Sequence, residues 1–430
     1  MYKKCINTKT HHNKKTDSLQ GHMVDKKIIK FDVRLFMRCT KKHEEFMFNF
    51  IKKVCEDIGP RSPCSKEEAQ CANFLQKQLN KYCDETLIDE FYCQPGAYRA
   101  MFHWPVILYI FAIPFYLFLP WVSLLLTIFA LVILIGNEMY NMETIDIFFK
   151  KQKSTNVIGK IKPTKQTKNI IILSGHHDSN WEFPMGKRYG TKVSIFMTLP
   201  IIFNSIISIF SIIKIIKPLP ELLNYIFIII LIAASLVMIP FFIKVISKTP
   251  VTGANDNLSA LAVCLAAAQY FSDPKNKLSN SELWIVSFGC EEIGIRGSKR
   301  FISKYFETIK DAFNINFDLI GEKGCEPYID RKEEMGLIKL SPEICDILEN
   351  AGKKVGIPMK QISVMCFTDS MAFAMKKLRS ASIVSFKPDG KMPSFYHTVN
   401  DKLENVDPHL LRKCLEVCFQ AVNDIDSKFS

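Results

Sequence analysis

Five short polar motifs contain the residues of this sequence that are best suited to chemistry. Three of the motifs directly follow predicted buried strands, where active sites form in α/β sheets. Together they offer two histidines and three carboxylates as metal ligands, one spare glutamate as a base, and two aspartates that can support the ligands. The motifs are residues 175–179 (GHHDS), 253–257 (GANDN), 291–292 (EE), 316–321 (NFDLIG) and 396–401 (YHTVND).

The adjacent glutamates Glu291 and Glu292 indicate what kind of site this is. Two neighbouring carboxylates repel each other unless a cation separates their roles, with one on a metal ion and the other free to take a proton. Mixed imidazole and carboxylate ligation suits Zn²⁺, and it also suits Mn²⁺ or Co²⁺. Five ligands exceed one tetrahedral zinc ion, so the motifs predict a two-metal site with one shared carboxylate.

The order HxD, GAxDN, EExGxxGS, NxDxIG and YHTxxD resembles that of the M28 family of co-catalytic zinc aminopeptidases. The resemblance covers residues 44–428 without two apolar blocks, and it includes the segment GPRSPCSKEEAQCANFLQKQL at 59–79. It implies two zinc ions per chain. In the implied ligand set His176 and Asp318 hold one ion, Glu292 and His397 hold the other, and Asp256 bridges the two.

The resemblance also implies roles for residues beside the metal ions. Glu291 is the expected general base and acid, Asp178 is expected to orient His176, and Asp401 to support His397. A cis peptide bond is expected between Asp256 and Asn257. The implied reaction is peptide hydrolysis by a hydroxide that bridges the two zinc ions, with the removal of N-terminal residues as the first expectation.

Three other functions stay open at this point. A single-zinc glutaminyl cyclase shares the fold and several motifs, and carboxypeptidase polarity is compatible with the same residues. A non-catalytic membrane receptor on a peptidase fold is a third alternative, although every expected ligand and base position is filled here. The expected partners are a peptide substrate and membrane lipid. Nucleic acid is not expected, because no basic helix or aromatic-basic strand is present. The oligomeric state is left open.

Three residues near the motifs have their own interpretations. His177 occupies the variable position of the first motif, so we expect packing or solvent exposure rather than ligation. Cys290 has no basic partner nearby in the sequence and is expected to be a packed thiol rather than a nucleophile. Asp369, in a segment that resembles a substrate-side loop of the family, either receives an amine or orders that loop, or it caps a helix over 371–377.

The elements that must position these motifs follow from apolar periodicity. Alternating strands and amphipathic helices predict an α/β fold with a mixed, mostly parallel sheet and helices on both faces. Helices are predicted over 46–58, 66–82 (with Ser65 as the N-cap), 259–271, 298–306, 342–355 and 409–425, and strands over 86–92, 170–174, 283–288, 313–317, 337–340 and 381–386.

Two apolar blocks interrupt this pattern. Residues 104–136 carry no charge, and residues 193–246 divide at Lys214–Pro220 into halves of 193–213 and 222–243. A spanning helix needs about 20 apolar residues. Because sheet elements lie on both sides of each block, each block must cross a membrane an even number of times. We therefore predict a transmembrane hairpin for the second block, and for the first a tight hairpin or re-entrant pair broken at 114–120.

Charge distribution predicts the orientation of an integral membrane protein. The net charge is +13, and most basic residues near the blocks lie on the side of the predicted sheet, which favours a cytoplasmic catalytic domain. These are Arg99, Lys150, Lys151, Lys153, Lys187, Arg188, Lys192, Lys244 and Lys248, whereas Lys214 and Lys217 lie in the far loop. The 14 cysteines form no disulfide framework or paired zinc spacing, which agrees with a reducing compartment.

These patterns predict a polar basic tail over 1–43 and a peptidase domain made of 44–100, 139–192 and 248–430. The two membrane insertions are expected at 101–138 and 193–247.

Overall fold

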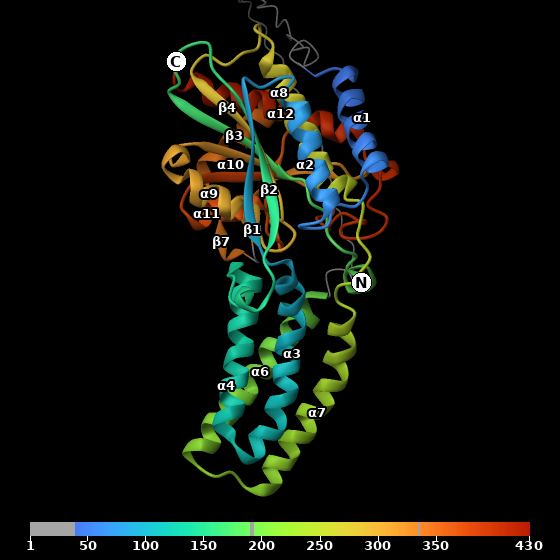
Figure 1. Cartoon of the computed structure of the whole chain (residues 1–430), viewed down its shortest axis with the longest axis vertical. Coiled ribbons are helices and arrows are strands. Elements are labelled where there is room, and N and C mark those ends of the chain that lie inside the picture. The colour runs from blue at the N-terminus through green and yellow to red at the C-terminus, as the bar shows by residue number, and fades with distance from the viewer. Residues whose placement is uncertain (1–38, 190–192, 334–335) are drawn as a thin grey trace, which may run out of the picture. The chain divides into compact units, whose positions relative to one another are not determined.

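A computed structural model describes residues 39–189, 193–333 and 336–430. The predicted polar tail over 1–43 lies almost wholly outside these residues. The described residues fall in one compact unit, Met37–Ser430. This unit consists of an α/β part and four long apolar helices (Figure 1).

The chain enters the α/β part through two helices, α1 (Lys41–Asp57) and α2 (Lys66–Leu79). Both were predicted, although α1 begins five residues earlier than expected and α2 ends three residues earlier. Ser65 is confirmed as the N-cap of α2, because its hydroxyl accepts a hydrogen bond from the amide of Glu68 at 3.0 Å. Gly59 has a φ of +77° in the turn between them, a conformation that glycine adopts at little cost.

A nine-stranded mixed sheet forms the centre of the α/β part, with the order β1-β2-β4-β3-β5-β9-β6-β7 and β8 paired to β6. The four central strands β4, β3, β5 and β9 are parallel, whereas β1, β2, β6 and β7 add antiparallel pairs on either side. The strands are β1 (Glu85–Cys93), β2 (Gln152–Ile161), β3 (Asn169–His176), β4 (Ser281–Phe288), β5 (Phe313–Asp318), β6 (Glu326–Glu333), β7 (Ile338–Lys339), β8 (Lys360–Ser363) and β9 (Arg379–Phe386).

Sequence patterns missed β2, β6 and β8. These strands carry charged or polar residues at several positions, for example EPYIDRKE in β6, so they lack the apolar run by which the central strands were recognised. They lie outside the parallel core of the sheet, where one face or edge reaches solvent and polar residues are tolerated. The mixed α/β fold with its parallel centre is confirmed.

Helices cover both faces of the sheet. In β3, Ile171 and Leu173 pack into a core shared with α1, α2, α8 (Ser259–Ser272), α10 (Pro342–Lys354) and α12 (Pro408–Ser427). The intervening Ile172 packs on the opposite face with α9 (Arg296–Ile309) and α11 (Asp369–Met375). Because alternate side chains enter different cores, the central strands are apolar throughout their length.

Four helices are long and apolar enough to cross a membrane: α3 (Pro95–Phe118), α4 (Pro120–Ile133, apolar as far as Asn137), α6 (Val193–Ile216) and α7 (Glu221–Ile243). They form two consecutive pairs, and a short helix α5 (Pro184–Tyr189) precedes the second pair. The predicted break at 114–120 is confirmed and lies at the end of that range. Pro114 lies inside α3, and the turn is at Leu119, where Pro120 occupies the first turn of α4 and needs no amide partner.

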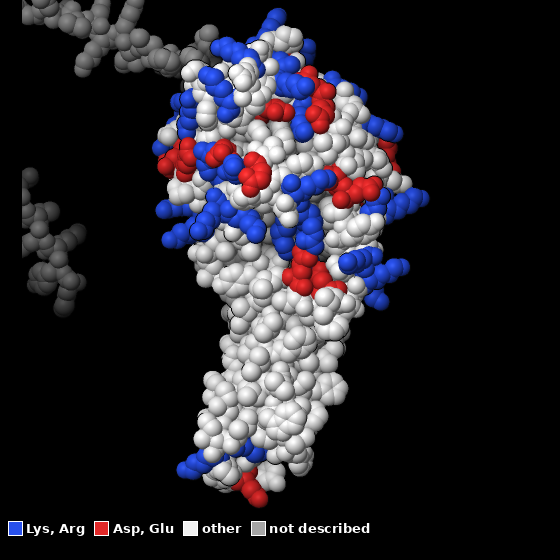
Figure 2. Space-filling view, turned by 60° about the vertical axis from the view of Figure 1, so that its left-hand side comes forward, with Lys and Arg blue, Asp and Glu red and all other residues white. Residues whose placement is uncertain are grey.

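Polar side chains connect these helices internally, while their outer surface is apolar. The hydroxyl of Tyr109 donates to the carbonyl of Leu231 at 2.8 Å, and the hydroxyl of Tyr116 donates to Oδ1 of Asn224 at 2.9 Å. Figure 2 shows an uncharged surface between the charged α/β part and a charged far end. The exposed apolar side chains of these helices include Phe118 of α3, which is 78% exposed. An apolar surface of this size is typical of lipid or protein contact.

Candidate metal centre

The five sequence motifs meet where the central parallel strands end. This follows from the topology, since parallel strands present their carboxyl ends at one edge of the sheet. His176 ends β3, Asp318 ends β5, Glu291 and Glu292 lie in the turn after β4, Asp256 lies in the turn before α8, and His397 lies in the loop before α12.

Asp256 lies between the two histidines. Its Oδ1 is 3.2 Å from Nε2 of His176, and its Oδ2 is 3.1 Å from Nε2 of His397. The side chains of His176 and Asp256 are almost fully buried, and that of His397 is 13% exposed. One carboxylate therefore faces two imidazoles with one oxygen each, which is the arrangement that a bridging ligand requires.

Glu292 and Asp318 complete two groups of potential ligand atoms that share Asp256. Oε2 of Glu292 is 3.1 Å from Nε2 of His397, and Oδ1 of Asp318 is 3.9 Å from Nε2 of His176. Within each group the ligand atoms all lie within 4.8 Å of one another. The fold thus brings together the two groups that the sequence analysis had paired.

Asp178 and Glu291 lie at the same site. The two oxygens of Asp178 accept hydrogen bonds from the amides of Glu291 and Glu292, each at 3.1 Å, and Oδ1 is 3.4 Å from Nδ1 of His176. Oε2 of Glu291 is 3.7 Å from Nε2 of His176. Asp178 therefore contacts the predicted ligand His176, as expected, and it also holds the backbone that carries both glutamates.

Asp401 supports a different residue from the one expected. Its Oδ1 accepts from the amide of Asn255 at 2.7 Å, and its Oδ2 accepts from the amide of Asp256 at 3.0 Å. The expectation that it supports His397 is corrected, because these two hydrogen bonds fix the turn that carries Asp256. The peptide bond between Asp256 and Asn257 is cis, as the resemblance implied.

Arg61 is a buried residue whose role the sequence did not predict. Its guanidinium donates to four backbone carbonyls, those of His177 (2.7 Å), Gly59 (2.8 Å), Thr252 (2.8 Å) and Gly253 (3.1 Å). It thereby joins the turn after α1 to the segment after His176 and to the turn before Asp256. No local pattern could indicate this, because the partners on those two segments lie more than a hundred residues away in the sequence.

Burial perturbs the ionisation of the site. Desolvation raises the pKa of Glu291, Glu292 and Asp318 above the usual carboxyl range. Burial acts to lower the pKa of His397, but the carboxylates of Glu292 and Asp256 outweigh it and raise that pKa to about 10. For Asp256, burial acts to raise the pKa, whereas hydrogen bonds from His176 and His397 bring it below the usual value.

The residues of the site fit bound zinc. Oε1 of Glu291, Oε1 of Glu292 and Oδ1 of Asp318 are buried and have no hydrogen-bond partner in the described part of the chain. Buried carboxylates of this kind are costly unless a cation neutralises them. Imidazole nitrogens and carboxylate oxygens are also ligands that zinc takes in proteins.

Three neighbouring residues complete the description. His177 is fully buried with Nδ1 2.8 Å from Oγ of Ser287, so the expected packing role is confirmed. The N-cap of α11 is Thr368, not Asp369; Asp369 is the first helical residue, and its buried carboxylate has a pKa raised by desolvation to about 7. Asn180, which the sequence analysis did not single out, donates through Nδ2 to Oε2 of Glu292 at 2.6 Å.

Comparison with known proteins finds a family match that covers most of this site. Residues 240–422 match the sequence profile described as "Peptidase family M28", and this range contains Asp256, Glu291, Glu292, Asp318 and His397. Aminopeptidase YwaD of Bacillus subtilis (strain 168) is 25% identical to this chain over 182 residues. The aligned region is 41% of this chain and only 38% of that relative, so the chain matches well under half of its length.

Solved structures share the fold at low sequence identity. BSAP, described as a zinc aminopeptidase from Bacillus subtilis, superposes with a TM-score of 0.54 at 15% identity, covering 89% of this chain and 94% of its own. A glutaminyl cyclase from Bacteroides thetaiotaomicron superposes with a TM-score of 0.52, also at 15% identity, covering 89% of this chain and 97% of its own. These likenesses show a zinc aminopeptidase-like fold, and both enzyme classes occur on it.

Proposed function

We propose that this chain, which carries a domain of peptidase family M28, is a membrane-anchored zinc aminopeptidase that removes N-terminal residues from peptides. The observation that carries the proposal is the pair of ligand groups that share Asp256. A single-metal enzyme needs only one such group, whereas two groups around one carboxylate provide for two ions. The peptide substrate and the aminopeptidase polarity follow from the family resemblance.

In this proposal the ligand set is the one that the family resemblance implies. His176 and Asp318 would hold one zinc ion, Glu292 and His397 would hold the second, and Asp256 would belong to both ligand groups. Asp178 positions these ligands, because it holds the amides of Glu291 and Glu292 and lies beside His176. Carboxylate support of this kind is typical of metal-ligating histidines.

Glu291 moves the proton in the proposed reaction. The bound ions would supply a Lewis acid for the peptide carbonyl and a water molecule of lowered pKa. Glu291 takes a proton from the attacking water and donates it to the departing amine. Desolvation raises the pKa of this carboxylate, which makes it a stronger base than an exposed glutamate. Its neighbour Glu292 faces His397 instead, so the proposal assigns different roles to the two glutamates.

Membrane anchoring is proposed from the four apolar helices. The four helices form two consecutive pairs, so the chain returns to the same side of the membrane after each pair. This return is required, because the α/β part is built from segments that lie before, between and after the pairs. Basic residues near the α/β end of the helices favour a cytoplasmic catalytic part. In the proposed layout the insertions at 101–138 and 193–247 interrupt a peptidase domain of 44–100, 139–192 and 248–430.

One substrate distinguishes the candidate reactions. A short peptide with an N-terminal glutamine is incubated with detergent-purified protein, and the products are identified by mass spectrometry. An aminopeptidase releases free glutamine, a glutaminyl cyclase releases ammonia and leaves a pyroglutamyl peptide, and a carboxypeptidase shortens the other end. We expect free glutamine from this peptide and no product from its N-acetylated form. Release of the C-terminal residue or formation of pyroglutamate contradicts the proposal.

The role of Glu291 is tested by Glu291→Gln. The amide cannot take up a proton, so we expect turnover to fall by about 100-fold or more while the zinc content stays that of the wild type. The matched control is Glu326→Gln, which changes an exposed glutamate at the start of β6. Near-wild-type turnover in Glu291→Gln would exclude this residue as the base.

A further inference from the structure

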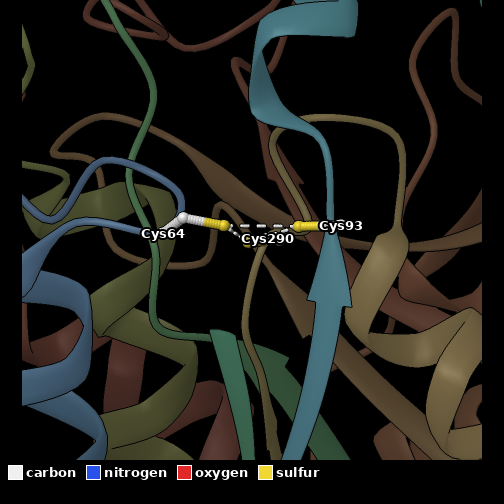
Figure 3. A group of neighbouring side chains, drawn as sticks. All are labelled: Cys64, Cys93 and Cys290. Carbon is white, nitrogen blue, oxygen red and sulfur yellow. Dashed lines mark hydrogen bonds between the residues drawn. The ribbon is translucent and has the colours of Figure 1, made fainter. Parts of the chain in front are cut away.

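Three cysteines form a compact cluster beside the proposed active site (Figure 3). The sulfur atom of Cys64 is 3.3 Å from that of Cys93 and 3.5 Å from that of Cys290, and the sulfur atoms of Cys93 and Cys290 are 3.5 Å apart. Cys64 lies in the turn between α1 and α2, Cys93 ends β1, and Cys290 lies in the turn after β4. Three separate segments thus bring their thiols to one point.

The cluster differs from the other cysteines of the protein. In the described ranges it is the only group of three cysteines whose sulfur atoms lie within 4.8 Å of one another, although thirteen cysteines are free there. Cys93 and Cys290 are fully buried, Cys64 is partly buried, and Phe91, Ile293 and Trp181 pack around them. Apolar side chains therefore pack around the cluster. Cysteines that serve only as packing residues do not require three sulfur atoms in mutual contact.

A buried carboxylate lies beside one of these cysteines, Cys290. Glu68 is 1% exposed, and its Oε1 lies 3.3 Å from the sulfur atom of Cys290. Its two oxygens also accept hydrogen bonds from the amides of Cys64 (2.8 Å) and Cys290 (3.0 Å). No ion pair to Glu68 is found among the described residues. Glu68 thus fixes the backbone of two of the three cysteines, so the cluster is held by contacts between the turn before α2 and the turn after β4.

We propose that Cys64, Cys93 and Cys290 bind one thiophilic metal ion, with Zn²⁺ as the expected ion and the three thiolates as its protein ligands. Sulfur atoms this close together accommodate Zn–S bonds of about 2.3 Å if the ion lies about 1 Å out of the plane of the three sulfurs. Such a pyramidal arrangement leaves the fourth tetrahedral position open to an oxygen ligand. The three thiols release their protons to solvent when the ion binds.

This site is separate from the proposed catalytic centre and has a structural role. It shares no ligand with the two groups around Asp256. Cys290 directly precedes Glu291, so an ion on Cys290 ties the turn that carries the proposed base to the end of β1 and to the turn before α2. Structural zinc sites stabilise folds by joining distant segments in this way.

The test uses cobalt, because thiolate ligands produce a charge-transfer band in the near ultraviolet that histidine and carboxylate ligands lack. The full chain, stripped of metal and reduced with a phosphine, is titrated with Co²⁺ in detergent. We expect the band in the wild type and its retention in Asp256→Ala, where the catalytic centre is disrupted. The outcome therefore does not depend on the proposed peptidase activity.

Substitutions then locate the band. Cys93→Ser and Cys64→Ser are each expected to remove most of it, whereas Cys345→Ser, which changes a buried cysteine of α10 outside the cluster, keeps it. The partly buried Cys64 provides a variant that folds even if Cys93→Ser does not. Absence of the band in the reduced wild type, or its full persistence in Cys64→Ser, would overturn the proposal. The proposal would also be overturned if the purified protein contained a disulfide within the cluster and still showed no cobalt band after that disulfide was reduced.

Discussion

Replacing Arg61 with lysine tests whether one buried side chain holds the metal-binding turns together. The guanidinium donates to four carbonyls, on the turn after α1, on the segment after His176 and on the turn before Asp256. Lysine keeps the positive charge but carries its donors on a single nitrogen atom. It cannot reach carbonyls on three segments at once, so the substitution isolates the geometry of the hydrogen bonds from the charge.

The magnitude follows from the carbonyls that lose their donor. If lysine retains two of the four bonds, two buried carbonyls stay unsatisfied, and each costs about 1–3 kcal/mol. The free energy of unfolding should therefore fall by about 2–6 kcal/mol, and zinc should bind more weakly because both turns shift. Thermal and denaturant unfolding in detergent measure the first effect, and metal titration measures the second.

The matched control for this prediction is Arg331→Lys, which changes an exposed arginine of β6. A surface substitution of this kind is expected to change stability by less than about 0.5 kcal/mol. If Arg61→Lys unfolds at the same temperature as the wild type and binds zinc equally well, the four hydrogen bonds do not position the site, and the reasoning fails.

Two further substitutions test a contact of the metal centre and a buried carboxylate of β6. Asp401→Asn leaves one of the amides of Asn255 and Asp256 without its acceptor, so zinc affinity should fall by about 10–100-fold. An unchanged zinc titration would show that the turn keeps its conformation without these hydrogen bonds. Burial raises the pKa of Asp330 to about 7 and also raises that of its neighbour Glu333, so the native state keeps protons that the unfolded chain loses above about pH 4, and stability declines as pH rises through this window. Asp330→Asn avoids that loss, and its unfolding temperature relative to the wild type should increase from pH 5 to pH 8; a constant difference would contradict the assigned pKa.

The predictable part of the fold is the part with strong apolar patterns. The buried run at Ile171–Leu173 identifies β3 from the sequence alone, and the end of that run puts His176 at the sheet edge. The apolar blocks are recognisable because their length exceeds that of a buried helix. The first block breaks at Leu119, within the predicted range 114–120, because Pro114 can remain in a helix whose surroundings are apolar, whereas Pro120 starts a new one.

What the sequence could not provide depends on contacts between distant segments. Cys64, Cys93 and Cys290 have no regular spacing, and only the meeting of two turns with the end of β1 brings them together. Asn180 and Arg61 contact the site through partners fixed by the tertiary fold. The proposed ligand residues could be named from the sequence because their motifs resemble those of a known family.

The central claim is a two-metal site with Asp256 between the ions, and zinc content tests it most directly. Zinc per chain is measured by mass spectrometry on detergent-purified wild type and Asp256→Ala, prepared side by side without chelator. Any zinc on the cysteine cluster is common to both proteins and cancels in the difference. The account predicts that Asp256→Ala contains two fewer zinc ions per chain than the wild type. A difference of one ion or none would contradict it.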